Sequence, residues 1–180
     1  MRIFLTGVSC VGKTTIGEKL AHLLDSQFVD VDYEIEKFFG TSIERLQNRF
    51  FSVRAYQKEA SKALENLLLF QNEFVLALPP SGLIGSYWKL VKNASGTIIV
   101  LRDKPENILK RLVFFDIDSN PLEKKLSKKE EKLYLKAIRK DINYYNRSYG
   151  RADIRVRING AGPDESVGMI MRKIRDKLSI

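Results

Sequence analysis

The chain has 180 residues, of which 44% are hydrophobic, and its formal net charge is +9. These values are ordinary for one globular domain with its own core, so we expect a single domain over residues 1–180. No segment approaches the roughly 18 consecutive apolar residues of a membrane span, and no secretory signal precedes the first apolar run. We therefore expect a cytoplasmic protein that does not contact membranes. The single cysteine, Cys10, excludes an intramolecular disulfide and a multi-cysteine metal site.

The positive charge is concentrated in residues 124–140, where lysines and arginines greatly outnumber acids. A basic surface can attract nucleic acid. Clustered lysines are more often a solvated helix face, and such a field also suits an enzyme with anionic substrates. We therefore favour a small-molecule substrate over nucleic acid. We also expect a monomer.

The first predicted strand, residues 3–5, is followed by a segment that matches the phosphate-binding pattern G-x-x-x-x-G-K-[ST]. The two glycines let backbone N–H groups turn toward phosphate oxygens, and the helix that follows adds the positive end of its dipole. In this pattern Lys13 reaches the β- and γ-phosphates as a catalytic residue, and Thr14 binds Mg²⁺. An accidental glycine-rich turn is the alternative, which the flanking strand and helix disfavour. The predicted ATP site consists of Gly7, Ser9, Cys10, Val11, Gly12, Lys13, Thr14 and Thr15.

A second strand is predicted at residues 28–32, where apolar and acidic residues alternate. Asp30 and Asp32 would then project from one face of the strand, near the phosphate-binding loop. One carboxylate could hold Mg²⁺ while the other serves an acceptor hydroxyl. A strand end that simply meets solvent is the alternative, which the neighbouring loop makes less favoured.

The remaining elements follow from caps and periodicity. We expect a short helix at 34–39, a helix that begins at a capping box of Thr41 and Glu44, and a long helix at 51–70. Continuous apolar runs predict buried strands at 74–78 and 97–101, and alternation predicts an edge strand at 154–158. Asp103 is a candidate cap for the next helix, residues 114–126 look irregular, and a further helix follows the Ser127 and Glu130 capping box. Strands that alternate with helices predict a three-layer α/β/α fold with a five-stranded parallel sheet.

At this point the chain resembles the shikimate kinase family, which has a P-loop kinase fold of the nucleoside monophosphate kinase type. The likeness is carried by Ile3 to Gly17, by Phe28 to Glu36 with its F-x-D-x-D pattern, and by Ser42-Ile43. By this resemblance Asp30 lies beside Mg²⁺, and Asp32 binds a substrate hydroxyl beside the attacking oxygen.

The resemblance also implies roles for residues further along the chain. Arg54, at the start of the long helix, would bind a substrate carboxylate, for which an arginine fork is well suited; an exposed helix arginine is the alternative. Arg111 and Pro163 would flank the adenine. Residues 113–126 would form a lid over the site.

Two parts of the chain depart from the family pattern. The family has a run of glycines where this chain has Pro79-Pro80-Ser81-Gly82, so only Ser81 and Gly82 could offer backbone N–H groups to the substrate. The lid arginine is replaced by Asn120, which Lys124 or Lys125 could compensate. For the substrate arginine that the family places before its last strand, Arg139 is the preferred candidate and Arg147 the other.

These observations predict an ATP- and Mg²⁺-dependent enzyme that phosphorylates a hydroxyl of a small anionic metabolite. The resemblance implies shikimate, converted to shikimate 3-phosphate. The two departures leave two alternatives open: a P-loop kinase of another small molecule or nucleotide, and a catalytically impaired nucleotide-binding homologue.

Overall fold

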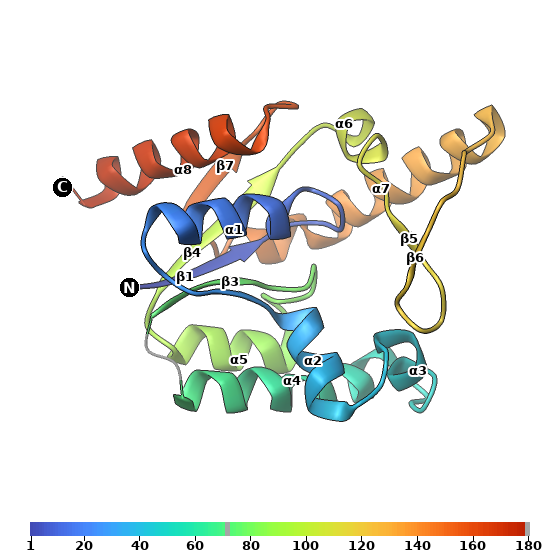
Figure 1. Ribbon diagram of the computed structural model, residues 1–180, viewed down its shortest axis with the longest axis horizontal. Coiled ribbons are helices and arrows are strands. Elements are labelled where there is room, and N and C mark those ends of the chain that lie inside the picture. The colour runs from blue at the N-terminus through green and yellow to red at the C-terminus, as the bar shows by residue number, and fades with distance from the viewer. Residues whose placement is uncertain (71–72, 179–180) are drawn as a thin grey trace.

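A five-stranded parallel sheet forms the centre of the molecule (Figure 1). The computed structural model describes residues 1–70 and 73–178. Along the sheet the strands are β2 (Phe28–Asp30), β3 (Phe74–Ala77), β1 (Arg2–Thr6), β4 (Thr97–Arg102) and β7 (Ile154–Arg157). The strand predicted at 154–158 does lie at the edge.

Helices cover both faces of this sheet, which confirms the predicted α/β/α layers (Figure 1). On one face lie α1 (Lys13–Leu23) and α8 (Pro163–Leu178), which contact each other. On the other face lie α2 (Val31–Phe39), α4 (Val53–Phe70) and α5 (Gly85–Asn93). The remaining helices are α3 (Ile43–Gln47), α6 (Pro105–Leu109) and α7 (Lys128–Tyr149).

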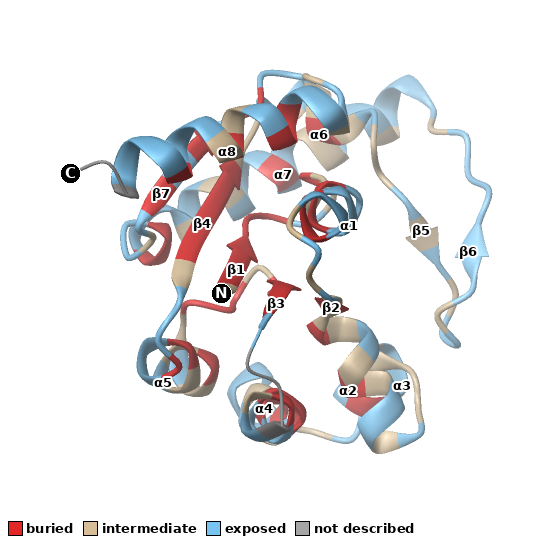
Figure 2. Cartoon of the chain, turned by 60° about the vertical axis from the view of Figure 1, so that its left-hand side comes forward, coloured by how far each residue is buried: buried red, intermediate tan, exposed pale blue. Residues whose placement is uncertain are grey.

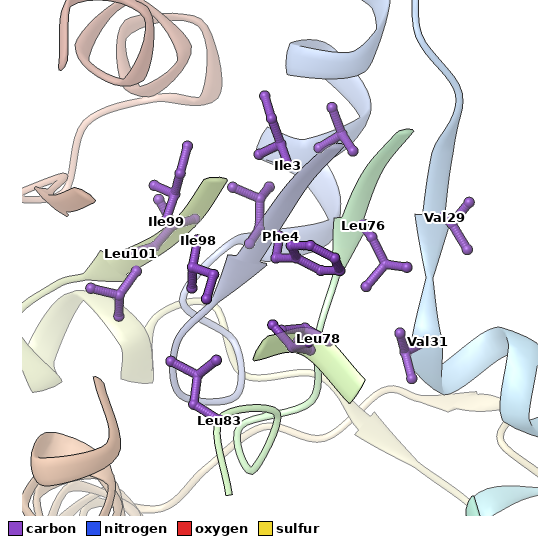
Figure 3. Packing of buried hydrophobic residues seen from close by; sticks show 14 of the residues in the cluster. Ile3, Phe4, Val29, Val31, Leu76, Leu78, Leu83, Ile98, Ile99 and Leu101 are labelled. Atoms are coloured by element: carbon purple, nitrogen blue, oxygen red, sulfur yellow. The ribbon is translucent and has the colours of Figure 1, made fainter. Parts of the chain in front are cut away.

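The central strands are buried on both faces, as their continuous apolar sequences predict (Figure 2). Figure 3 shows their side chains packed together, and the rings of Phe4 and Phe74 meet edge to face with centroids 5.5 Å apart. Ile3, Phe4 and Leu5 are completely buried. The sheet therefore gives a fixed base for the loops that leave the carboxyl ends of its strands, where ligands bind in folds of this class.

Three sequence expectations need correction. Ser42, and not Thr41, caps α3 by accepting a hydrogen bond from the Arg45 amide, while the Thr41 amide donates to Glu36. The N-cap of α6 is Lys104, because the Asp103 carboxylate is used for tertiary contacts described below. The segment expected to be irregular contains a two-stranded antiparallel hairpin, β5 (Phe114–Phe115) and β6 (Pro121–Leu122).

The capping box of Ser127 and Glu130 is present at the start of α7. Within the described residues, no helix combines the length and apolarity that a membrane crossing needs.

Candidate active site

The phosphate-binding loop joins β1 to α1 through two glycines with positive φ angles, 149° at Gly7 and 105° at Gly12. A Cβ atom at Gly7 would lie 2.7 Å from the carbonyl oxygen of Leu101. Only glycine therefore fits at this position, because both the dihedral angle and the close approach of β4 exclude a side chain.

The N-terminus of α1 is left open to a ligand. Gly12 is its N-cap, no side chain caps it, and its first turn contains no acidic residue. The start of α7 is instead closed by the Ser127 and Glu130 capping box. The first N–H groups of α1, which lack partners within the helix, and the positive end of its dipole can therefore bind an anion.

Lys13 lies over the loop that it follows. Its Nζ atom donates hydrogen bonds to the carbonyl oxygens of Gly7 and Val8, both at 3.1 Å. Burial lowers the pKa of Lys13, and the nearby carboxylates of Asp32 and Asp30 partly oppose this shift. The ammonium group is thus held among acceptors beside the open helix end, where a phosphate could replace the two carbonyl oxygens.

Asp30 connects the end of β2 to the phosphate-binding loop. Its Oδ2 atom accepts a hydrogen bond of 2.8 Å from the Thr14 hydroxyl, and its Oδ1 atom accepts one of 3.0 Å from the Asp32 amide. The second bond makes Asp30 the N-cap of α2, so the strand ends at Asp30 and not at Asp32 as predicted. Asp32 therefore reaches the site from the first turn of a helix.

The pair of Thr14 and Asp30 fits a magnesium ion in its chemistry. A hydroxyl oxygen and a carboxylate oxygen lie within hydrogen-bond distance of each other, and Mg²⁺ prefers oxygen ligands. Among the described residues, no group of three or more histidine, cysteine or acidic side chains could hold a metal by itself. Phosphate oxygens of a bound nucleotide would have to supply further ligands, as is usual for Mg²⁺ at phosphoryl-transfer sites.

Asp32 is a carboxylate in an environment that disfavours its charge. Burial and the neighbouring Asp30 raise the pKa of Asp32 from 3.8 to about 6, while Lys13 acts in the opposite direction. A carboxylate with this pKa is half protonated near pH 6 and ionised at pH 7. It can therefore accept a proton from a hydroxyl at neutral pH.

Asp32 lines a cavity of about 470 Å³ beside the phosphate-binding loop. We call this cavity the Asp32 cavity. Ser9 of the loop lines it on one side, and Ser81 of the turn after β3 lines it on another. Most of its remaining wall is aromatic or apolar. These wall residues include Ile43, Phe50, Phe51, Val53, Tyr56, Pro79, Pro80, Tyr87 and Tyr145.

Of the two residues proposed to offer backbone N–H groups, only Ser81 lines this cavity. The Gly82 amide donates to the carbonyl oxygen of Pro79 at 2.8 Å and closes the turn. A Cβ atom at Gly82 would lie 2.6 Å from Cβ of Leu78, so this glycine is needed for packing. The geometry therefore gives no support to Gly82 as a substrate ligand.

The predicted substrate arginines are not among the residues that line the Asp32 cavity. Arg54 is exposed at the start of α4, where Val53 and Gln57 line the cavity. Arg139 lines a different cavity and pairs with Glu106 at 2.8 Å. Within the described chain the lining contains no arginine or lysine.

Tyr56 and Tyr145 are site residues that the sequence interpretation missed. Both line the Asp32 cavity, from α4 and α7 respectively. Burial raises the pKa of each, so both phenols are neutral donors at physiological pH. Tyr56 fits the apolar stripe of its helix, so its sequence context indicates a core residue, and no motif surrounds Tyr145.

Arg111 is fixed against the back of the phosphate-binding loop. It donates to the Val11 carbonyl oxygen at 3.2 Å and to the Asp103 carboxylate. Asp103 also accepts from the Gly160 amide at 3.0 Å, in the loop that leads to Pro163 at the start of α8. Asp103 therefore joins the two segments that were predicted to flank the adenine, an anchoring role that its assignment as a helix cap had missed.

The β5–β6 hairpin reaches across the site to α2 and α3 (Figure 1). Arg45 of α3 makes two hydrogen bonds to Asp118, at 2.5 and 3.1 Å, and Ser42 donates to the Ile117 carbonyl oxygen at 2.5 Å. Ser119 donates to the Glu36 carboxylate of α2. The tip of the hairpin is therefore held on the side of the molecule that carries Asp32.

The two lysines proposed to replace the lid arginine differ in their surroundings. The Lys124 ammonium pairs with Glu130 at 3.1 Å and lies 5.3 Å from the ring centroid of Phe114. Lys124 is thus engaged at the base of the hairpin. Lys125 is exposed and is therefore the better candidate to replace the charge that is missing at Asn120, which stays a prediction.

Comparisons with known proteins agree with this geometry. The family model described as shikimate kinase matches residues 9–175. A shikimate kinase of Persephonella marina is 31% identical over 175 residues, which covers 96% of this chain and 98% of that protein. The crystal structure of shikimate kinase from Aquifex aeolicus is 28% identical, covers 99% of this chain and 98% of its own, and superposes with a TM-score of 0.70.

A third comparison concerns the fold alone. Shikimate kinase from Acinetobacter baumannii, solved in complex with shikimate, is 24% identical, covers 98% of this chain and 93% of its own, and has a TM-score of 0.73. Sequence and fold agree over nearly the whole length. The chain belongs to the shikimate kinase family of small-molecule kinases.

Proposed function

We propose that the protein transfers the γ-phosphoryl group of ATP to a hydroxyl of shikimate, giving shikimate 3-phosphate. The observation that carries this proposal is that the phosphate-binding loop and the acidic residue after β2 line the same cavity. Ser9 of the phosphate-binding loop and Asp32 both line one cavity, so an acceptor placed there would face the end of a bound triphosphate. Phosphoryl transfer depends mainly on such positioning and on charge neutralisation.

Each part of the site then has a role. The open N-terminus of α1 and Lys13 bind the phosphates, and Lys13 stabilises the charge that develops during transfer. Thr14 and Asp30 would hold Mg²⁺, which would neutralise negative charge on the phosphates. Asp32 orients the acceptor hydroxyl and accepts its proton.

The adenine would lie between Arg111 and Pro163, whose loops Asp103 connects. Residues 113–126 would act as a lid whose tip, held by Arg45, excludes water from the transferred phosphoryl group. For the acceptor carboxylate, Arg54 is the assigned cation, and its sequence neighbour Val53 lines the cavity while Arg54 itself does not. Movement of its flexible side chain would be needed for contact.

A second candidate function is phosphorylation of another small hydroxyl compound. One observation favours it: the wall of the Asp32 cavity combines aromatic and apolar side chains with uncharged polar ones such as Gln47 and Gln57, and contains no arginine or lysine among its described residues. Such a wall suits a less anionic acceptor than shikimate.

We also propose that the enzyme works as a monomer in the cytoplasm without nucleic acid. The lone Cys10 suits a reducing compartment. The lysines of α7 are largely exposed, as expected of a solvated helix face. Size-exclusion chromatography with light scattering tests the monomer.

The deciding experiment is a coupled ADP-release assay with ATP and Mg²⁺ against shikimate, gluconate and a set of nucleoside monophosphates. We expect turnover with shikimate and none in Lys13→Ala, which sets the background. Turnover on another acceptor alone would establish the second candidate and contradict shikimate as substrate. If no compound is phosphorylated but the protein still binds MgATP, the result would favour a nucleotide-binding protein that has lost catalysis.

A further inference from the structure

A second and larger cavity, of about 540 Å³, lies at the carboxyl ends of β4 and β7 beneath α7. We call it the basic cavity. It shares no lining residue with the Asp32 cavity, and neither Arg111 nor Pro163 lines it. It is therefore distinct from the Asp32 cavity, and it borders the nucleotide site through Val8 of the phosphate-binding loop and through Asp103.

Four cationic side chains line this cavity: Arg102, Lys104, Arg139 and Arg157. Its one carboxylate belongs to Asp103, which is already bound by the Arg111 guanidinium and by the amides of Lys104 and Gly160. Among the four cations, Arg139 is paired with Glu106. Lys104 also lies near enough to Glu106 to lower the pKa of that carboxyl. Arg102 and Arg157 form no salt bridge with the described residues.

Arg102 lies in an environment that disfavours its charge. Its Nε atom is buried and has no hydrogen-bond partner among the described residues. Burial, and repulsion by Arg155 and Arg157, lower the pKa of Arg102 below its ordinary value. A buried donor without a partner and several neighbouring positive charges both raise the free energy of the folded protein. One anionic ligand could accept a hydrogen bond from the donor and reduce the repulsion.

The uncharged part of the lining indicates the rest of the ligand. Asn143 and Asn146 of α7 and Asn159 after β7 offer amides that can bind hydroxyl or carbonyl groups. Leu101 and Ile142 provide an apolar wall. A volume of about 540 Å³ is in the range of sites for small organic molecules.

We propose that the basic cavity is a binding site for a small organic anion that carries at least two negative charges on phosphate or carboxylate groups. Arg102 and Arg157 bind those groups, since planar guanidinium forks match both phosphate and carboxylate. The asparagines bind the polar body of the ligand. The site is independent of the acceptor, so it stands whichever hydroxyl compound the enzyme phosphorylates.

Isothermal titration calorimetry of the full chain tests this proposal, with two probes: citrate for carboxylates and fructose 1,6-bisphosphate for phosphates. Each probe is titrated both without MgADP and with saturating MgADP, which fills the phosphate-binding loop. We expect saturable binding of at least one probe, and the two arms show which anionic group is preferred. Arg157→Gln should weaken this binding at least tenfold, because a charge-assisted hydrogen bond is lost.

Arg155→Gln is the matched control. It removes the same charge from the same exposed face of β7, two residues away, but from a side chain outside the cavity lining. We expect it to change the affinity less than twofold. Asn143→Trp, on the exposed surface of α7, fills the cavity without changing the charge and should also abolish binding.

Three results would overturn the proposal: no binding of either probe at millimolar concentration, equal weakening by Arg155→Gln and Arg157→Gln, or binding that MgADP abolishes. Equal weakening would mean a general basic surface, and competition by MgADP would make the cavity part of the nucleotide site. Failure of turnover on shikimate leaves this titration unaffected, so the two proposals are tested separately.

Discussion

Asp32 must satisfy two opposing demands. Acceptance of a proton from a hydroxyl requires an ionised carboxylate, but burial and the nearby Asp30 favour the protonated form. The Lys13 ammonium offsets part of this cost. A group whose charge is disfavoured in the folded state, and which is nevertheless kept beside a cavity and a phosphate-binding loop, is typical of a catalytic carboxylate.

This conflict predicts that Asp32→Asn stabilises the protein at neutral pH. The folded-state pKa of about 6 exceeds the ordinary value of 3.8, so ionisation of Asp32 favours the unfolded chain. The stabilisation should be absent below pH 4, grow as the pH rises to about 6, and stay constant above. We expect a gain of roughly 1–3 kcal/mol in the free energy of unfolding at pH 7, measured by urea denaturation.

Glu34→Gln is the control, since Glu34 lies on the same first turn of α2, where its charge favours the helix dipole. It should give no gain. Equal stability of Asp32→Asn and the parent protein at all pH values would contradict this account of Asp32.

At the residue scale, the glycines, Lys13 and Thr14 were predictable because their spacing is fixed by the loop that they form. The position of Asp32 was not. Val31 is β-branched and alternates with two aspartates, which favours a strand locally. The Asp30 side chain instead caps the Asp32 amide and starts a helix one residue later. The Asp30 side chain is also held by the Thr14 hydroxyl, a tertiary contact that the local sequence does not reveal.

The tip of the β5–β6 hairpin is bonded to parts of the chain that are distant in sequence. Asp118, Ile117 and Ser119 contact α2 and α3, more than 70 residues away in sequence. In the body of the hairpin β6 is exposed and β5 is partly so, as Figure 2 shows. Its position over the site therefore depends on a few polar contacts, which suits a segment that must open and close.

The pair of Arg45 and Asp118 should act on turnover more than on stability. Both side chains are about half exposed, so the pair contributes roughly 0–1 kcal/mol to folding. We expect Arg45→Ala to lower kcat by about three- to tenfold and to increase ATP hydrolysis without an acceptor, because the closed lid that excludes water is less populated. Parallel assays of phosphoryl transfer and of hydrolysis give the ratio.

Arg49→Ala provides the comparison, because Arg49 is also an exposed arginine after α3. The exchanged pair Arg45→Asp with Asp118→Arg should restore part of the lost turnover. Loss of thermal stability with an unchanged ratio of transfer to hydrolysis would contradict the lid function.

The elements themselves were largely predictable from hydrophobic periodicity, but their ends were not. Thr41 and Ser42 are both suitable N-caps, and the sequence does not say which hydroxyl will be used. Ser42 is chosen in the fold, where it also binds Ile117 of the hairpin. Likewise Asp103 is a good helix cap by type, but it is used to join Arg111 and Gly160.

At the scale of the molecule, the parallel sheet was predictable because alternation of strands and helices allows few topologies. The two cavities were not, because each is lined by segments that are distant in sequence. Arg139 illustrates this: its helix could be predicted, but the face of the helix that meets each cavity could not. The fold places Tyr145 at the Asp32 cavity and Arg139 at the basic cavity.

The central claim is that the loop from Gly7 to Thr14 binds the triphosphate of ATP with Mg²⁺. Calorimetric titration with MgATP tests it most directly, with the exposed Lys132→Ala as control for loss of one lysine. The account predicts saturable, Mg²⁺-dependent binding that Lys13→Ala weakens at least tenfold, while Lys132→Ala leaves it unchanged. Absence of Mg²⁺-dependent binding in the parent protein, or equal affinity in Lys13→Ala, would contradict it.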